Sequence, residues 1–228
     1  MDKFSQEEFN KFIDENNVYG FFENAITLKS GRKSHFYINW RTIVEDTYLT
    51  DQLSDFVIAF AKFQNIKVDT FYGVPEGATK IGIISQFKQA RQSSNYEKGS
   101  HVLAMGRAKP KDHGAAKDKF FVGMPKGRVV VIEDVTTTGG SLITTLQGLK
   151  EAGVNIEAVF SLSNRMEKRD DKKSVKEAVN ELGLKFYSMS SALEMLPIFY
   201  AKESPGEEIA KAITREFEEY GVEKINFI

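Results

Sequence analysis

The chain has 228 residues, 31 of them basic and 32 acidic, and a formal net charge of −1. This length can bury a full core and fits one domain, and the balanced charge does not favour nucleic acid or a membrane surface as a partner. The 0 cysteines exclude disulfides, thiolate catalysis and cysteine-bound zinc, and the 3 histidines argue against a histidine-rich metal site. No apolar stretch is long enough to span a membrane or to act as a signal for export, so we expect a cytoplasmic protein.

The first predicted element is a helix from about Ser5 to Asn16. Ser5 and Glu8 have the spacing of a capping box, and Phe4 and Phe9 have the spacing of a hydrophobic staple. This is a structural signal only.

The segment 25–40 predicts two short strands joined by a turn at Gly31. Its tip carries the cationic residues Lys29, Arg32 and Lys33. The aromatic residues Phe36, Tyr37 and Trp40 follow. From the pattern alone, the simplest interpretation is a solvated basic hairpin with an aromatic face toward the core.

A helix from 51 to about 65 and a strand from 70 to 74 come next. The strand ends in a glycine-bearing turn, 73–78, and a helix with Ile81, Ile84 and Phe87 on its apolar side follows. A turn of this kind between strand and helix can bind phosphate, although the pattern is weak evidence by itself.

A short strand is predicted at 101–105, and an unusual loop, 107–119, follows it. The loop contains Arg107, Lys109, Lys111, His113, Lys117 and Lys119 against Asp112 and Asp118. The remaining residues are alanine, glycine and proline, so the loop has no core of its own. It is either a solvated excursion or a lid that orders on an anion.

The stretch 128–141 is the most informative part of the sequence. Four apolar residues, 129–132, predict a buried parallel strand, and the carboxylates Glu133 and Asp134 follow directly. The next turn is rich in threonine and glycine, so its backbone N–H groups and the start of the following helix can approach a phosphate. The carboxylates would repel a bare phosphate and should instead accept hydrogen bonds from sugar hydroxyls or hold hydrated Mg²⁺. We therefore expect a phosphorylated sugar as ligand; the alternative is a tight turn whose hydroxyls cap a helix.

In the rest of the chain, predicted helices and strands continue to alternate. The pattern predicts a helix at 140–152, a strand at 156–162, a helix at 174–182, a strand at 184–188 and a C-terminal helix at 207–220 that completes the sheet. This order predicts an α/β fold with a doubly wound parallel sheet, and Arg165 would lie at the edge of the sheet where ligands bind.

Three segments resemble a known family. Val-Val-Val-Ile-Glu-Asp-Val-Thr-Thr-Thr-Gly, from 129 to 139, resembles the signature of type I phosphoribosyltransferases, which bind 5-phosphoribosyl-1-pyrophosphate (PRPP). Thr-Leu-Lys-Ser-Gly-Arg-Lys-Ser, from 27 to 34, resembles the N-terminal hood of orotate phosphoribosyltransferases, and 107–114 resembles their catalytic loop. The resemblance implies one phosphoribosyltransferase domain over 1–228, with a small N-terminal hood at about 1–45 and a flexible catalytic loop at 107–119.

Site residues are implied by position. The catalytic residues would be Lys111, His113 and Asp134. The PRPP-binding residues would be Gly77, Arg107, Lys111, His113, Glu133, Asp134, Val135, Thr136, Thr137, Thr138, Gly139, Gly140 and Ser141. Orotate would be bound by Lys29, Tyr37, Thr137 and Arg165. The chain departs from the family at Gly77 and Ala108, where relatives carry lysine; Lys80 and Lys109 are the nearest candidates to replace them. It also departs at His35, in place of a proline, and at Met166, in place of a glutamine.

The implied activity is Mg²⁺-dependent transfer of the phosphoribosyl group from PRPP to orotate, which gives orotidine 5′-monophosphate and pyrophosphate. This is a glycosyltransferase step of pyrimidine biosynthesis. PRPP itself would hold most of the magnesium coordination, with Glu133 and Asp134 contributing through water. The family also implies a homodimer in which each catalytic loop reaches the neighbouring site. Two alternatives stay open: a purine or uracil phosphoribosyltransferase, and a non-enzymatic regulator that senses PRPP.

Overall fold

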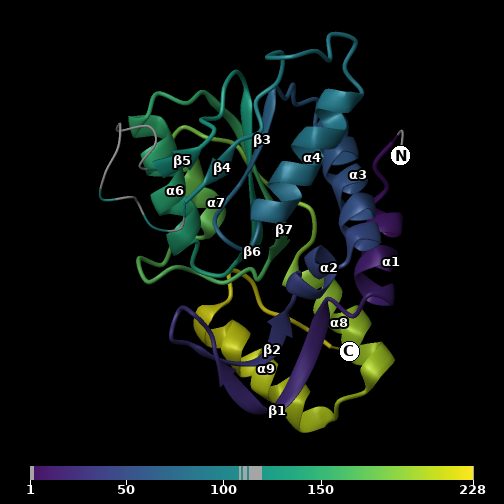
Figure 1. The fold of residues 1–228 in the computed structure, drawn as a ribbon. Coiled ribbons are helices and arrows are strands. Elements are labelled where there is room, and N and C mark those ends of the chain that lie inside the picture. The colour runs from purple at the N-terminus through teal and green to yellow at the C-terminus, as the bar shows by residue number, and fades with distance from the viewer. Residues whose placement is uncertain (1–2, 108, 110–111, 113–119, 228) are drawn as a thin grey trace.

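The computed structural model describes residues 3–107, 109, 112 and 120–227. A 4-stranded parallel sheet in the order β3–β6–β7–β8 forms its centre, as Figure 1 shows. The strands of this sheet are β3 (Thr70–Gly73), β6 (Val129–Thr136), β7 (Ile156–Asn164) and β8 (Phe186–Ser188). The helices are α1 (Gln6–Glu15), α2 (Arg41–Glu45), α3 (Thr47–Phe63), α4 (Thr79–Arg91), α6 (Gly140–Glu151), α7 (Val175–Glu181), α8 (Ala192–Glu203) and α9 (Glu207–Tyr220).

The central strand β6 is covered on both faces. Val130 and Ile132 pack into one core together with residues of α3 and α8, whereas Val129 and Val131 pack into a second core with α6 and α7. All four side chains are fully buried. An uninterrupted apolar run is what a parallel strand between two helical layers requires, and the doubly wound α/β sheet predicted from the sequence is confirmed.

Local signals placed the start of α1 well and the start of α3 less well. The Ser5 hydroxyl accepts a hydrogen bond from the Glu8 N–H at 3.3 Å, and the rings of Phe4 and Phe9 lie 5.8 Å apart, so α1 begins where the sequence predicted. Helix α3 begins at Thr47, and the predicted start at 51 is too late. The reason is a cap: the Asp46 side chain accepts the Leu49 N–H at 2.9 Å.

The buried face of α4 differs from the predicted apolar stripe. Phe87 is 48% exposed, and the buried residues besides Ile81 are small or polar, namely Gly82, Ser85, Gln86 and Ala90. Gly82 allows the helix to approach the backbone of β3, since a Cβ there would come 2.3 Å from the nitrogen of Gly73. Gln86 accepts the Phe71 N–H at 2.9 Å at the edge of the sheet. Close packing of α4 on the edge strand β3 therefore requires small or polar residues on the buried face of the helix. The prediction that Phe87 lies on this buried face was wrong.

The strand predicted at 101–105 is also corrected. The extended pair is β4 (Met105–Gly106), which joins antiparallel to β5 (Phe121–Val122). The Arg107 N–H donates to the Phe120 carbonyl at 2.9 Å, which continues this pairing. The partner strand lies beyond the cationic loop, so no local pattern could reveal it. The pairing holds together the two ends of the segment that contains the predicted catalytic loop.

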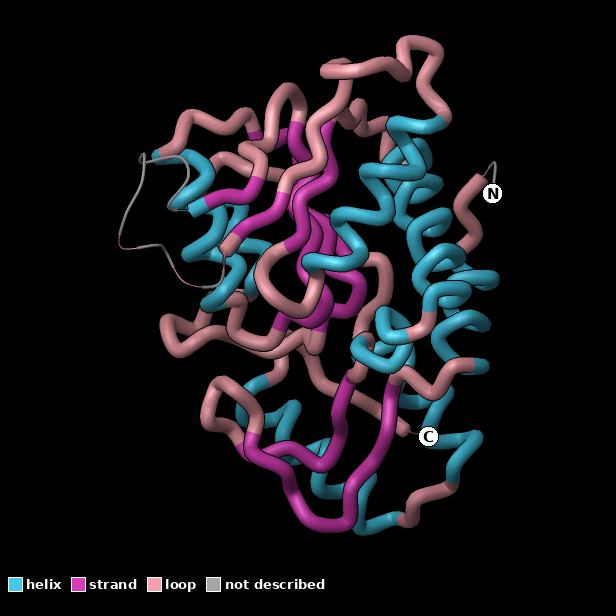
Figure 2. Tube along the Cα trace, viewed as in Figure 1, coloured by secondary structure: helices cyan, strands magenta, loops and turns pink. Residues whose placement is uncertain are grey.

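The hood hairpin forms a separate layer at one end of the parallel sheet, as Figure 2 shows. Its strands β1 (Tyr19–Thr27) and β2 (Lys33–Ile38) pair antiparallel around the turn at Gly31, as predicted. The prediction that the C-terminal helix completes the sheet was wrong, because α9 packs on the hairpin, where the rings of Phe36 and Phe217 stack 6.1 Å apart. Helix α8, which the sequence analysis did not identify, packs there too, with Phe199 5.3 Å from Tyr19. No helix within the described ranges has the length and apolarity needed to cross a membrane.

Candidate active site

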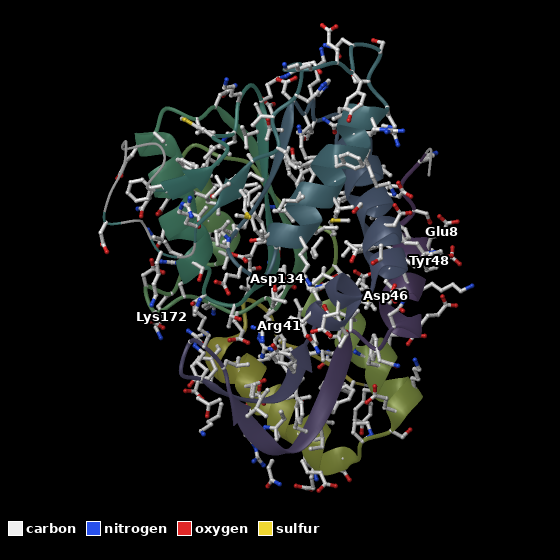
Figure 3. The ribbon with its side chains drawn as sticks, viewed as in Figure 1. Glu8, Arg41, Asp46, Tyr48, Asp134 and Lys172 are labelled. Carbon is white, nitrogen blue, oxygen red and sulfur yellow. The ribbon has the colours of Figure 1, made fainter. Side chains whose placement is uncertain are left out.

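The turn after β6 faces the tip of the hood hairpin. The ammonium group of Lys29 donates a hydrogen bond of 3.0 Å to the hydroxyl of Ser141, although 112 positions separate them in the chain. Figure 3 shows Asp134 at the same boundary between sheet and hairpin. The fold therefore brings the Lys29 segment and the 128–141 segment together, as the sequence analysis required of them.

The turn 137–141 presents several backbone N–H groups without partners in the described part of the chain. Its five backbone N–H groups have no hydrogen-bond acceptor among the described residues. Gly139 adopts the left-handed conformation (φ 67°), and α6 begins after it without any side-chain cap. The alternative interpretation, in which hydroxyls of the turn cap the helix, is therefore not what the structure contains. Unpaired N–H groups at a helix N-terminus are a general anion-binding arrangement.

The carboxylates of Glu133 and Asp134 have different environments. Glu133 is only 7% exposed, and its burial, reinforced by the negative charge of Asp134, raises its pKa well above the ordinary value. Asp134 is partly exposed, and one of its oxygens accepts the Val135 N–H at 2.8 Å. Asp134 is thus the more exposed of the two carboxylates.

Gly77 brings the second predicted loop against the same carboxylate. A Cβ atom at position 77 would lie 2.2 Å from an oxygen of Asp134, so the side chain found in many relatives does not fit here unless Asp134 moves. The preceding peptide bond, between Pro75 and Glu76, is cis. The nearby Lys80 donates to the Val44 carbonyl at 3.0 Å, which directs its side chain to α2.

Arg165 lies just past the end of β7, as predicted, and is 1% exposed. Its guanidinium donates to Glu167 at 2.7 Å, to the Ser34 hydroxyl at 2.8 Å and to the Phe36 carbonyl at 3.3 Å. It also lies over the ring of Phe36, 3.7 Å from the centroid. A guanidinium has five N–H donors, so one N–H on each terminal nitrogen remains beyond these bonds.

Arg32 does not sit on a solvated tip, and the simplest interpretation of the hairpin was wrong for this residue. Its side chain is 9% exposed and donates to Glu167 at 3.0 Å and to Asp170 at 3.1 Å. It also lies 4.4 Å from the ring centroid of Tyr220. The carboxylate of Glu167 is therefore shared by Arg165 and Arg32, which docks the hairpin on the loop that follows β7.

The remaining predicted residues around the turn divide into supporting and exposed groups. The hydroxyl of Thr136 is buried and lies 3.2 Å from that of Ser161, so it links the end of β6 to the neighbouring strand β7. Thr137, Thr138 and Tyr37 are partly buried, and Gly140 is exposed. Val135 packs against the core. Arg107 is described and lies at the end of β4, whereas Lys111 and His113 fall outside the described residues.

Arg169 is a residue of this site that the sequence analysis missed. Its guanidinium donates to the Thr138 carbonyl at 2.6 Å. This bond fixes one peptide of the anion-binding turn, and fixing its carbonyl also fixes the adjoining Gly139 N–H on the other side of the peptide plane. The available signal was position, because Arg169, like Arg165 and Glu167, follows the carboxyl end of a predicted strand.

The acidic residues fit a magnesium ion that is held mainly by its substrate. Among the described residues, no three acidic, histidine or cysteine side chains converge as a metal site would require. Mg²⁺ keeps several waters and is commonly bound through one or two carboxylates together with substrate phosphates. Asp134, partly exposed beside an anion-binding turn, has the charge and position for that role.

Comparison with known proteins gives a consistent answer, although no protein-family model matches the chain. An orotate phosphoribosyltransferase of Bradyrhizobium sp. (strain BTAi1) is 33% identical over 185 residues, which cover 77% of this chain and 90% of that protein. The crystal structure of orotate phosphoribosyltransferase from Francisella tularensis has a TM-score of 0.67 at 22% identity and covers 94% of this chain and 99% of that one. A structure of the Mycobacterium tuberculosis enzyme in complex with PRPP has a TM-score of 0.57 at 17% identity, with 83% of this chain and 98% of that chain covered. With this identity to a relative that it covers almost completely, and with a parallel sheet and a hood hairpin, this chain belongs to the orotate phosphoribosyltransferase family.

Proposed function

We propose that the protein transfers the phosphoribosyl group of PRPP to orotate and releases pyrophosphate, forming orotidine 5′-monophosphate. The observation that carries this proposal is the turn 137–141. Its N–H groups lack acceptors among the described residues, while Asp134 lies beside it and Lys29 lies across it. One short turn thus offers donors for a phosphate and an acceptor for a sugar diol, opposite a cation from the hood.

The 5′-phosphate is assigned to the turn and the ribose to Asp134. Five N–H groups and the hydroxyls of Thr137, Thr138 and Ser141 can donate to the phosphate oxygens. The Ser141 hydroxyl can donate its proton to the phosphate while its oxygen still accepts the hydrogen bond from Lys29. Asp134 accepts hydrogen bonds from the ribose hydroxyls. Glu133 stays behind it, and its raised pKa favours the protonated form that does not add to the local negative charge.

The reaction requires opposite charges at the two ends of the breaking bond. Positive charge develops on the ribose ring as the bond to pyrophosphate lengthens, and the ionised Asp134 favours that charge. The leaving pyrophosphate gathers negative charge, which Arg107, Lys111 and His113 would offset once the loop 107–119 closes. When bound with PRPP, Mg²⁺ supplies further positive charge at the pyrophosphate. Orotate attacks through its ring nitrogen as the anion, so no strong general base is required.

The base is assigned to the space between Lys29, Tyr37, Thr137 and Arg165. Orotate is planar and carries a carboxylate, which calls for a stacking face and a cation. The two N–H groups of Arg165 that remain beyond its bonds to Glu167, Ser34 and Phe36 are the donors for this carboxylate. Because the guanidinium is buried, a pair formed there is protected from solvent and strengthened.

The assembly that we propose is a homodimer of one-domain chains spanning 1–228. The hood is the segment of about 1–45, and the catalytic loop 107–119 of each subunit reaches the partner's site. The ends of that loop are held together by β4 and β5, which supports a lid anchored at a narrow base. The location of the reaction is the cytoplasm, as expected from the sequence.

A base-exchange assay tests the proposal. The purified protein is supplied with PRPP, Mg²⁺ and one of three bases: orotate, uracil or hypoxanthine. We expect a nucleotide product with orotate and little or none with the other two, with ribose 5-phosphate in place of PRPP as the matched control. Turnover with uracil or hypoxanthine alone would favour the other phosphoribosyltransferases. PRPP binding without turnover of any base would favour the sensor.

A further inference from the structure

The C-terminal helix α9 supports the predicted orotate anchor from behind through two neighbouring residues. One oxygen of the Glu216 carboxylate accepts the His35 N–H at 2.7 Å and lies 2.9 Å from the His35 ring nitrogen Nδ1. Its other oxygen accepts the hydroxyl proton of Ser34 at 2.8 Å. The next residue, Phe217, stacks its ring on that of Phe36.

Both contacts lead to the same guanidinium. Ser34 accepts a hydrogen bond from Arg165 at 2.8 Å, and Phe36 offers Arg165 its carbonyl at 3.3 Å and its ring face at 3.7 Å. The two residues of β2 that contact Arg165 are therefore each in contact with one residue of α9: Ser34 with Glu216, and Phe36 with Phe217. Ser34 and Arg165 are both 1% exposed, so water does not compete for these bonds.

We propose that Glu216 is a positioning residue for base selection, which rests on the proposed function. The hydroxyl of Ser34 has one proton and two possible acceptors, the Glu216 carboxylate at 2.8 Å and the Phe36 carbonyl at 3.0 Å. The charged acceptor draws the proton. The Ser34 oxygen accepts the Phe36 N–H at 3.3 Å with one lone pair, and its other lone pair is then available to Arg165, as is the Phe36 carbonyl.

Without the carboxylate at 216, the Ser34 proton turns to the Phe36 carbonyl, which Arg165 must then share. The guanidinium loses part of the hydrogen bonding that fixes its plane, so the orientation of its two remaining N–H groups is less constrained. Helix α9 itself has other anchors, since Ile209, Ile213 and Phe217 are buried in the core. A change at Glu216 should therefore alter Arg165 without detaching the helix.

The test is steady-state kinetics of Glu216→Gln and Glu216→Ala. Glutamine keeps the volume, and the His35 N–H holds its one amide oxygen, so the amide NH2 faces Ser34, which can no longer donate there. We expect the KM for orotate to rise by about tenfold, the scale of one lost charge-assisted hydrogen bond, while the KM for PRPP changes less than about twofold. Glu218→Ala is the matched control, since Glu218 is an exposed glutamate on the same helix and should leave both values unchanged.

A double-mutant cycle identifies the route. If Glu216 acts through Ser34, then Ser34→Ala raises the orotate KM to a similar extent, and the double variant is little worse than either single one. The inference would be overturned if the increases in orotate KM from the two single variants multiply in the double variant. It would also be overturned if the KM values for orotate and PRPP rise equally, or if the orotate KM is unchanged in Glu216→Gln. A wild-type protein that does not convert orotate would instead count against the proposed function, so the two failures are distinguishable.

Discussion

Gly77 and Asp134 are in direct contact, because a Cβ atom on Gly77 would fall 2.2 Å from an oxygen of the Asp134 carboxylate. The loop after β3 and the turn after β6 thus meet at the carboxylate to which we assign the ribose. The family commonly places a lysine in the first of these loops. Here the loop has glycine at position 77, so its backbone can approach the Asp134 carboxylate closely. The observed position of Asp134 depends on the absence of a side chain there.

The first prediction follows from this contact. Gly77→Ala should displace Asp134 and lower kcat/KM for PRPP by about tenfold or more, because small misplacements of a catalytic group are costly. The control is Gly148→Ala in α6, where a Cβ meets nothing within 4 Å. That change should leave the kinetics unaltered and stabilise the helix by up to about 1 kcal/mol. Equal kinetics for the two variants would show that Asp134 does not depend on position 77.

The second prediction concerns the charge of Asp134. Asp134→Asn should weaken PRPP binding and lower kcat/KM by about tenfold or more, the scale of a hydrogen bond to a charged group. The thermal midpoint should stay close to that of the wild type, because Asp134 is partly exposed and an asparagine oxygen can still accept the hydrogen bond from the Val135 N–H. A variant that unfolds instead would make this carboxylate structural, and the ribose would need another acceptor.

The third prediction distinguishes the charge of Arg165 from its shape. Arg165→Lys keeps the charge near Glu167 but loses the planar fork that reaches Ser34 and Phe36. We expect the KM for orotate to rise about tenfold or more while that for PRPP is nearly unchanged. Lysine is preferable to alanine, since it keeps a second cation beside the buried Glu167 and fills more of the volume of the buried arginine. An unchanged orotate KM would remove Arg165 from the base site.

The fourth prediction uses the buried Glu133. Burial raises its pKa well above 4.5, so the protonated form is favoured in the folded state. The corresponding contribution to the free energy of unfolding is complete below the ordinary glutamate pKa and is lost as pH rises through the higher folded-state pKa. Urea titrations across this range should show wild-type stability falling with pH relative to Glu133→Gln. A constant difference between the two proteins at every pH would mean that Glu133 does not titrate in this way.

The fifth prediction tests the shared loop. Lys111→Ala in the loop and Asp134→Asn in the pocket should each inactivate the enzyme. When the two variants are mixed under conditions that exchange subunits, a heterodimer with loops acting on the partner's site contains one intact site and one site with both defects. Activity should return toward one half of wild type per heterodimer. If mixing with proven exchange restores nothing, each loop serves its own subunit.

The sequence identified the strands of the parallel sheet and the cap of α1 well, and its failures in packing have a common cause. The apolar run 129–132 predicted β6 because burial on both faces leaves a continuous signal. The bounds of α9 were also predicted, but not its position on the hairpin, since periodicity reveals which face is buried and not what covers it. The partners of Arg165 come from segments around 34–36 and 167, so its burial could not be read locally.

The measurement that tests the central claim most directly is phosphorus NMR of the wild-type protein with PRPP, orotate and Mg²⁺. The account predicts that PRPP disappears while orotidine 5′-monophosphate and pyrophosphate appear in equal amounts, and that Asp134→Asn slows both together. If PRPP is consumed to ribose 5-phosphate without any nucleotide, or if it persists in the presence of active protein and orotate, the assignment of orotate as the phosphoribosyl acceptor is contradicted.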